Sequence, residues 1–98
     1  MHAVVNHLQF EDDVDPAIFA SMDEVMSQMR GIAGFAGAHV VQTSAREVVL
    51  VILADRPETL DRVATEVGSP WMREHVVPLL AGPPDRRVGP VLISADIA

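Results

Sequence analysis

The sequence predicts an antiparallel α+β fold in which strands and helices follow the order β-α-β-β-α-β. Apolar residues alternate along short segments and recur at helical spacing along longer ones. Gly, Pro and Asp residues mark the boundaries between these segments. The chain has 98 residues, of which 49% are hydrophobic, so we expect one domain, residues 1–98, with a substantial core.

The first strand is expected over residues 2–10, and a helix is expected to follow it. Asp15 is suited to cap this helix, Pro16 fits its first position, and Gly31 and Gly34 end it. One stripe of the helix is apolar and consists of Ile18, Phe19, Met22, Val25, Met26, Met29, Ile32 and Ala33.

Three further strands are expected over residues 38–43, 47–54 and 88–97. Pro90 cannot donate a ladder hydrogen bond, so the last strand should be irregular or lie at an edge of the sheet. Two βαβ halves of this kind predict a ferredoxin-like antiparallel sheet with helices on one face.

The strand over residues 47–54 is apolar on both faces, whereas a sheet with one wet face should alternate. Helices cover only one face of such a sheet, so the other face must meet something else. The simplest candidate is the same face of a second copy, which predicts a homodimer whose two sheets close into a barrel. The alternative is a central strand that tolerates apolar residues on its outer side.

The late helical region contains the only tryptophan and a candidate pocket residue. A helix that opens at residues 55–57 is expected to break at residues 68–70, where Ser69 can cap a new helix. His75 then falls near the middle of an apolar stripe, one turn from Trp71, which indicates a small, dry pocket. The stripe consists of Trp71, Met72, His75, Val76 and Leu79.

Composition excludes several classes of function. The net charge is −7, and the basic residues, all arginine, form no basic stripe, which argues against nucleic-acid binding. The longest apolar run, residues 48–54, is far shorter than the roughly 20 residues that a membrane span needs. No secretory signal or membrane partner is expected. The chain has no cysteine, which fits a cytoplasmic protein, and its histidines lack metal-like spacing, so no metal site is expected.

The layout resembles the dimeric α+β barrel superfamily, and most of all its antibiotic-biosynthesis-monooxygenase-type domains. The resemblance covers nearly the whole chain and includes Gly34-Phe35-Ala36-Gly37 before the second strand and Ser69-Pro70-Trp71 at the late helix. It implies a homodimer with one pocket per subunit, between sheet and helices. Some members oxygenate aromatic polyketide-like substrates without metal or flavin, others cleave haem, and many have no known activity.

The resemblance therefore implies oxygenation or binding of a small hydrophobic aromatic compound, such as a quinol or an anthrone, with no cofactor. Once deprotonated, such a compound can pass an electron to oxygen by itself. The protein then supplies a base or hydrogen-bond donor, orientation and exclusion of water. One alternative is a non-catalytic ligand-binding or structural dimer. Another is a haem-binding or haem-degrading protein.

Asn6 and His75 are the candidate catalytic residues, and we expect them to line one pocket and act on the same ligand. Asn6 shares a strand face with apolar residues, and a buried amide must bond to backbone or ligand. The haem-degrading members have an asparagine at a similar place. A neutral imidazole at His75 can take a phenolic proton near neutral pH. The alternative for both residues is a core side chain satisfied by neighbouring groups.

The haem-degrading members also carry a histidine in a comparable late helix. Their tryptophan precedes it by about two and a half turns, where this chain has Thr65 or Glu66. Trp71 precedes His75 by only one turn, which argues against haem cleavage because the pocket around a porphyrin would differ in shape.

The candidate substrate-binding residues are Trp71, Met72, Phe19 and Met22. An indole N–H can meet a ligand oxygen, and thioethers suit an adaptable pocket for a flat aromatic. Core packing is the alternative for these side chains. Three arginines are expected at the surface or the rim of the dimer: Arg73, Arg86 and Arg87.

Overall fold

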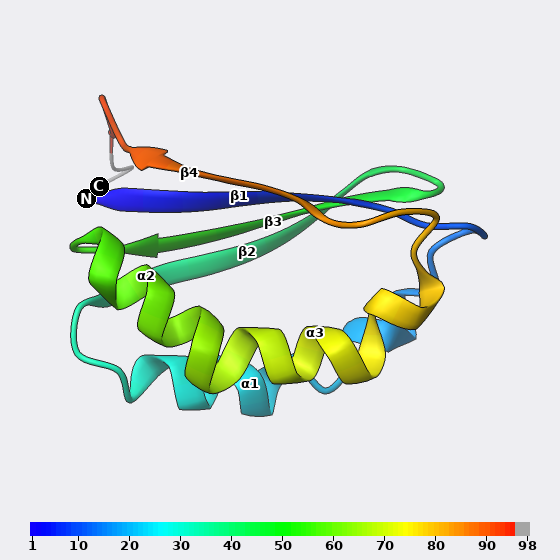
Figure 1. Cartoon of the computed structure of the whole chain (residues 1–98), viewed down its shortest axis with the longest axis horizontal. Helices are drawn as coiled ribbons and strands as arrows, with labels where there is room; N and C mark the ends of the chain where they lie inside the picture. Colours follow the sequence, from blue (N-terminus) through cyan, green and yellow to red (C-terminus); the bar gives the residue numbers. More distant parts are fainter. Residues whose placement is uncertain (96–98) are drawn as a thin grey trace.

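The computed structural model describes residues 1–95, and its four strands form one antiparallel sheet in the order β2-β3-β1-β4. The strands are β1 (His2–Gln9), β2 (Phe35–Ser44), β3 (Glu47–Ala54) and β4 (Asp85–Pro90). The helices lie against one face of this sheet and leave the other face open (Figure 1). The expected ferredoxin-like arrangement is confirmed.

The central strand β3 has the bounds that the sequence predicts and is apolar on both faces. It pairs with β1 and β2 along its whole length. Val48, Leu50 and Ile52 point towards the helices and are buried. Val49 and Val51 point to the open face and are only half-buried.

The first helical region is divided in two, whereas the sequence predicts one helix. Asp15 caps it as expected, because its Oδ1 accepts a hydrogen bond from the Ala17 N–H at 3.0 Å. The chain then forms a short 3-10 helix, η1 (Pro16–Phe19), followed by helix α1 (Met22–Arg30). A tight 3-10 bond from the Ala20 N–H to the Ala17 carbonyl closes η1 before α1 begins.

The late helical region does not break at residues 68–70 as expected. Helix α2 (Pro57–Val63) continues through a π turn, η2 (Ala64–Gly68), into α3 (Ser69–His75). Pro70 has no N–H to donate, and its ring would meet the carbonyl four residues before it in a regular α-helix. In the wider π turn, the Ser69 N–H bonds to the Ala64 carbonyl. The helical segment therefore changes direction here without ending (Figure 1), and a 3-10 helix, η3 (Val77–Leu79), follows it.

The last strand lies earlier than the expected residues 88–97. It spans Asp85–Pro90 and forms an edge of the sheet. Pro90 is its final residue because a proline cannot donate the next ladder bond. Residues 91–95 are not in a strand, and residues 96–98 of the expected strand lie outside the described residues.

The core lies between the sheet and the helices. Its most deeply buried large side chains are Leu8, Met29, Val48, Leu60, Val63 and Val76. Full burial of each such side chain stabilises the fold by about 1.5–3 kcal/mol. Within residues 1–95, no helix has the length and apolar character needed to cross a membrane.

A tight turn at Gly34 leads from α1 into β2, beside the end of β3. Gly34 has a φ of 94°, and a Cβ at this position would overlap the carboxylate of Asp55. The Asp55 N–H donates to the Gly34 carbonyl at 2.9 Å. The Thr59 hydroxyl donates to Asp55 Oδ1 at 2.6 Å. This hydrogen bond, aided by the nearby Arg56, holds the pKa of Asp55 below its ordinary value.

The lowered pKa of Asp55 predicts an acid-dependent contribution to stability. A carboxyl whose pKa is lower in the folded state stabilises the fold above its unfolded pKa, and this contribution disappears as pH falls through the folded pKa. Thr59→Val removes the hydrogen bond that lowers this pKa most, so we expect the pKa of Asp55 to rise in an NMR titration. We also expect the ionisation of Asp55 to contribute less to the pH dependence of acid unfolding. An unchanged Asp55 titration would show that the hydrogen bond does not set the pKa.

The two faces of β3 predict two different mutant phenotypes. Val49→Glu with Val51→Glu places carboxylates on the open face, so we expect a folded chain that no longer dimerises. Leu50→Glu with Ile52→Glu places them in the core, where an unpaired charge costs several kcal/mol, so we expect loss of the fold. Circular dichroism and sedimentation velocity measure both outcomes. A wild-type chain that sediments as a stable monomer at micromolar concentration would contradict the expected dimer.

Candidate functional site

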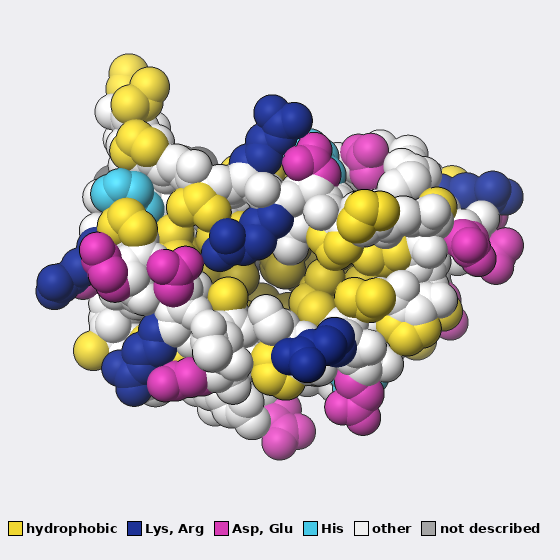
Figure 2. All heavy atoms as spheres, viewed as in Figure 1, with side chains coloured by type: hydrophobic (Ala, Val, Ile, Leu, Met, Phe, Trp, Pro, Cys, Tyr) yellow, Lys and Arg dark blue, Asp and Glu magenta, His cyan; other side chains and the backbone are white. Residues whose placement is uncertain are grey.

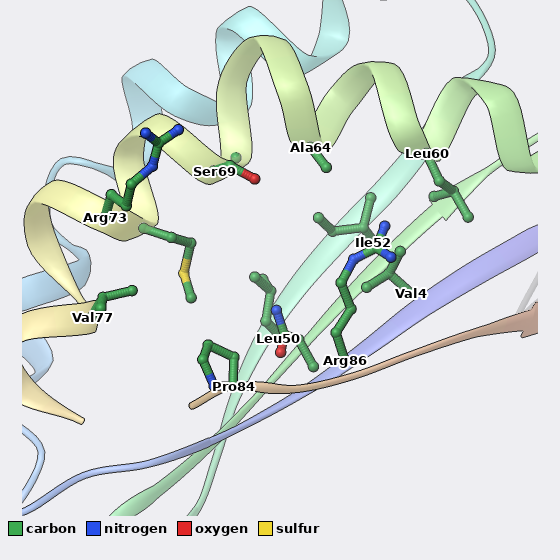
Figure 3. Close-up of a pocket in the computed structure, with 13 residues that line it drawn as sticks. Val4, Leu50, Ile52, Leu60, Ala64, Ser69, Arg73, Val77, Pro84 and Arg86 are labelled. Carbon is green, nitrogen blue, oxygen red and sulfur yellow. The ribbon is translucent and has the colours of Figure 1, made fainter. Parts of the chain in front are cut away.

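A cavity of about 370 Å³ lies between the sheet and the helical segment α2–η2–α3. Most of its wall is apolar, with strand residues on one side and helix residues on the other (Figure 3). Figure 2 shows it as a hollow with a hydrophobic floor. Its size falls within the range of sites that hold small ligands. The apolar side chains in its wall include Val4, Leu50, Ile52, Leu60, Met72 and Val77.

The strands and the π turn together create this space. Val4, Leu50 and Ile52 face the helices because side chains alternate along β1 and β3. On the opposite side, the cavity is lined by Ala64 and Gly68 from the π turn. Small residues here leave the gap between helix and sheet unfilled.

Asn6 supplies a buried polar atom in this apolar wall. It lies on β1 between Leu50 of β3 and Arg86 of β4 in the sheet register. Its Oδ1 atom is buried and accepts no hydrogen bond from the described residues. Leaving such an acceptor unpaired costs about 1–3 kcal/mol. A hydroxyl group on a ligand would satisfy this acceptor. Asn6 is a polar residue in the wall of the cavity, facing inwards as the sequence predicts.

The remaining polar side chains in the lining are Ser69, Arg73 and Arg86, and none of the described residues that line it is Asp, Glu or His. The sequence predicts Arg73 and Arg86 at the surface or at the rim of the dimer. The structure adds that both also line the cavity. Basic side chains lie on both sides of the hollow, one beside β4 and one beside α3 (Figure 2). Arg86 extends from β4 towards the helical segment, whereas the guanidinium of Arg73 points away from the strands (Figure 3).

His75 lies outside the cavity, so the expectation that it shares a pocket with Asn6 is wrong. Its side chain is 41% exposed. The imidazole lies against Trp71, with ring centroids 5.4 Å apart. The buried residues of α3 are Trp71 and Met72, and Val76 directly after the helix is also buried. The rotation of α3 is fixed because the helix continues from α2.

Trp71 has a structural partner on the side of α1. Its Nε1–H donates to Ser21 Oγ at 3.1 Å, and its ring lies 6.0 Å from that of Phe19. Met22 is a buried core residue near the start of α1. None of these three expected substrate contacts lines the cavity, whereas Met72 does. The structure thus brings together Asn6 and Met72 and separates them from Trp71, Phe19, Met22 and His75.

Sequence reasoning missed the two arginines and the small residues of the π turn. The sequence predicts that the last strand starts at residue 88, and this prediction places Arg86 in a loop before the strand. A strand extended back to Asp85 would have placed Arg86 and Val88 on one face by alternation. Within residues 1–95, no group of three or more His, Asp or Glu side chains is arranged to hold a metal ion.

Solved structures share this fold. A cofactor-independent oxygenase, SnoaB from Streptomyces nogalater, is 12% identical with a TM-score of 0.72, covering 95% of this chain and 94% of its own. The monooxygenase from the gene ActVA-Orf6 of Streptomyces coelicolor, in complex with the ligand Nanaomycin D, is 22% identical with a TM-score of 0.65, covering 95% and 92%. A dimeric ferredoxin-like protein from an uncultured marine organism is 14% identical with a TM-score of 0.70, covering 99% and 100%.

No family model matches the sequence, and no curated protein matches it. The structural likeness nevertheless confirms the expected resemblance to antibiotic-biosynthesis-monooxygenase-like proteins at the level of the fold. The chain has the ferredoxin-like fold of the dimeric α+β barrel proteins.

Proposed function

We propose that this protein binds a small hydrophobic aromatic compound of the quinol or anthrone type in the cavity and oxidises it with molecular oxygen, without a tightly held cofactor. The observation that carries the proposal is the buried, unpaired Asn6 Oδ1 in a mostly apolar cavity. The similarity in fold to a cofactor-independent oxygenase and to a monooxygenase bound to Nanaomycin D supports it.

The chemistry needs little from the protein. An ionised anthrone gives one electron to oxygen, and the resulting radical and superoxide combine to a peroxide. Loss of water then leaves a quinone, so the ring methylene loses two hydrogens and gains one oxygen atom while the second oxygen atom leaves as water. In this scheme Asn6 orients a substrate hydroxyl, and the apolar wall excludes bulk water. Because the lining contains no Asp, Glu or His among residues 1–95, the substrate proton passes to solvent at the mouth of the cavity.

The proposed active form is a homodimer joined through the open face of the sheet. Val49, Val51 and Leu53 are half-buried on this face, and Val41 is 48% exposed. Covering these side chains removes apolar surface from water. The cavity lies on the opposite face of the sheet, so each subunit has its own site. The dimeric ferredoxin-like protein with the same fold supports this assembly.

A non-catalytic ligand-binding protein is the second candidate. The absence of any carboxylate or imidazole among the described residues that line the cavity favours it, because a general base usually assists proton removal. The haem alternative has no such support, since His75 lies outside the cavity and half-exposed.

Asn6→Leu separates a ligand-binding role from a structural one. Leucine has a similar size but no acceptor, so we expect the melting temperature to stay the same or to rise, because an unpaired buried oxygen is removed. Oxygen uptake with a dihydroxyanthrone should fall by about tenfold or more, the effect of losing one hydrogen bond to a charged substrate. An oxygen electrode, with the spontaneous oxidation rate subtracted, measures this change.

Gln28→Leu is the matched control, because it removes an exposed amide from α1 and should leave oxygen uptake unchanged. Wild-type uptake in Asn6→Leu would contradict the proposed role of Asn6. Binding of the anthrone without any acceleration of oxygen uptake by the wild-type protein would reject the oxygenase and favour the second candidate.

A further inference from the structure

We propose that the ligand of this cavity is an aromatic hydroxy acid, whose hydroxyl meets Asn6 and whose acid group meets Arg86. The inference rests on the proposed function in taking the cavity as the ligand site. It goes beyond that function by naming an anionic substituent as a requirement for binding.

The charges around the cavity favour an anion. The chain carries a net charge of −7, so most of its surface repels anions. Among the described residues, the lining of the cavity is the reverse, since it contains Arg73 and Arg86 and no acidic residue. The guanidinium of Arg86 lies beside an apolar surface, where a cation attracts a carboxylate more strongly than it would in open solvent.

The sheet register places the two recognition groups side by side. Asn6 and Arg86 are paired residues on adjacent antiparallel strands and share the helix-facing side. Cross-strand neighbours have Cβ atoms about 4.5–5.5 Å apart. A hydroxyl and an acid group separated by one ring carbon, too far apart to bond each other, can therefore reach both residues, while the ring lies against the apolar wall.

Arg86 is available for such a contact. Its nearest carboxylate partner is Asp61, with Nη2 and Oδ1 separated by 3.9 Å, which is too long for a hydrogen bond. The Asp61 side chain is 76% exposed, so this ion pair contributes little. By contrast, Arg62 Nε donates to both carboxylate oxygens of Glu66 at 3.1 and 3.2 Å. A ligand carboxylate can bind the planar guanidinium of Arg86 through two parallel hydrogen bonds.

Arg73 contributes differently. Its guanidinium points away from the strands (Figure 3), and it forms no ion pair within residues 1–95. We assign it a longer-range attraction on the anion, which is weaker and more sensitive to salt than a direct contact.

The test compares two probes that differ in one charge: 4-hydroxy-2-naphthoate and its methyl ester. Binding is measured by calorimetry or ligand fluorescence near neutral pH, without any oxygen-uptake reading. We expect the wild-type protein to bind the acid about tenfold more tightly than the ester, as a charge-assisted contact provides. Arg86→Met should abolish this preference, and Arg73→Met should reduce it by about two- to threefold. Arg62→Met changes net charge equally at an exposed site and should keep the preference.

Equal affinity of the wild-type protein for acid and ester would overturn the proposal, as would a preference that survives in Arg86→Met. Equal loss of preference in Arg62→Met would also overturn it, since only net charge would then matter. A salt titration of the wild-type protein provides a test that does not depend on a variant folding. Affinity for the acid should fall as NaCl rises from about 0.02 to about 0.5 M, while affinity for the ester should stay constant. An equal dependence of both affinities on salt would contradict the ion pair.

The same data separate this inference from the proposed function. Preferential binding of the acid with no accelerated oxygen uptake keeps the hydroxy-acid site and rejects the oxygenase. Accelerated oxidation of an uncharged anthrone, together with equal binding of the two naphthoate probes, keeps the oxygenase and rejects the acid subsite.

Discussion

The strand β3 carries apolar side chains on both faces, and the other features of the molecule follow from this constraint. On one face, Leu50 and Ile52 are covered by helices and form the floor of the cavity. On the other, Val49 and Val51 have no helix above them. The sheet therefore separates a ligand-binding side from a side suited to association. A change on one face need not disturb the other, because side chains alternate strictly along the strand.

The cavity depends on a local feature of the helical layer. Pro70 cannot continue a regular α-helix, and the π turn before it lets the helix proceed in a new direction. The turn presents Ala64 and Gly68 to the sheet, where larger side chains would fill the space. Asn6 lies on the strand side of that space, with its Oδ1 atom buried and unpaired. A proline within a helix thus leads, through backbone geometry, to a mostly apolar site with a few polar side chains in its lining.

The sequence alone predicted the parts of the fold that depend on short-range periodicity. The bounds of β3 follow from a continuous apolar run, and the inward position of Asn6 follows from alternation along β1; both are found in the structure. The rotation of α3 could not be predicted in the same way. Helical spacing defines a stripe, but the preceding helix and its π turn decide which part of the stripe meets the sheet. Met72 faces the cavity as a result, and His75 lies half-exposed beside Trp71.

The central claim is that Asn6, and not the Trp71–His75 pair, contacts the ligand. The most direct measurement is an NMR titration of the nitrogen-labelled protein with 4-hydroxy-2-naphthoate. The account predicts that the side-chain amide signals of Asn6 shift with the ligand while the indole N–H of Trp71 and the ring of His75 stay in place. Shifts at Trp71 and His75 with an unmoved Asn6 amide would contradict it.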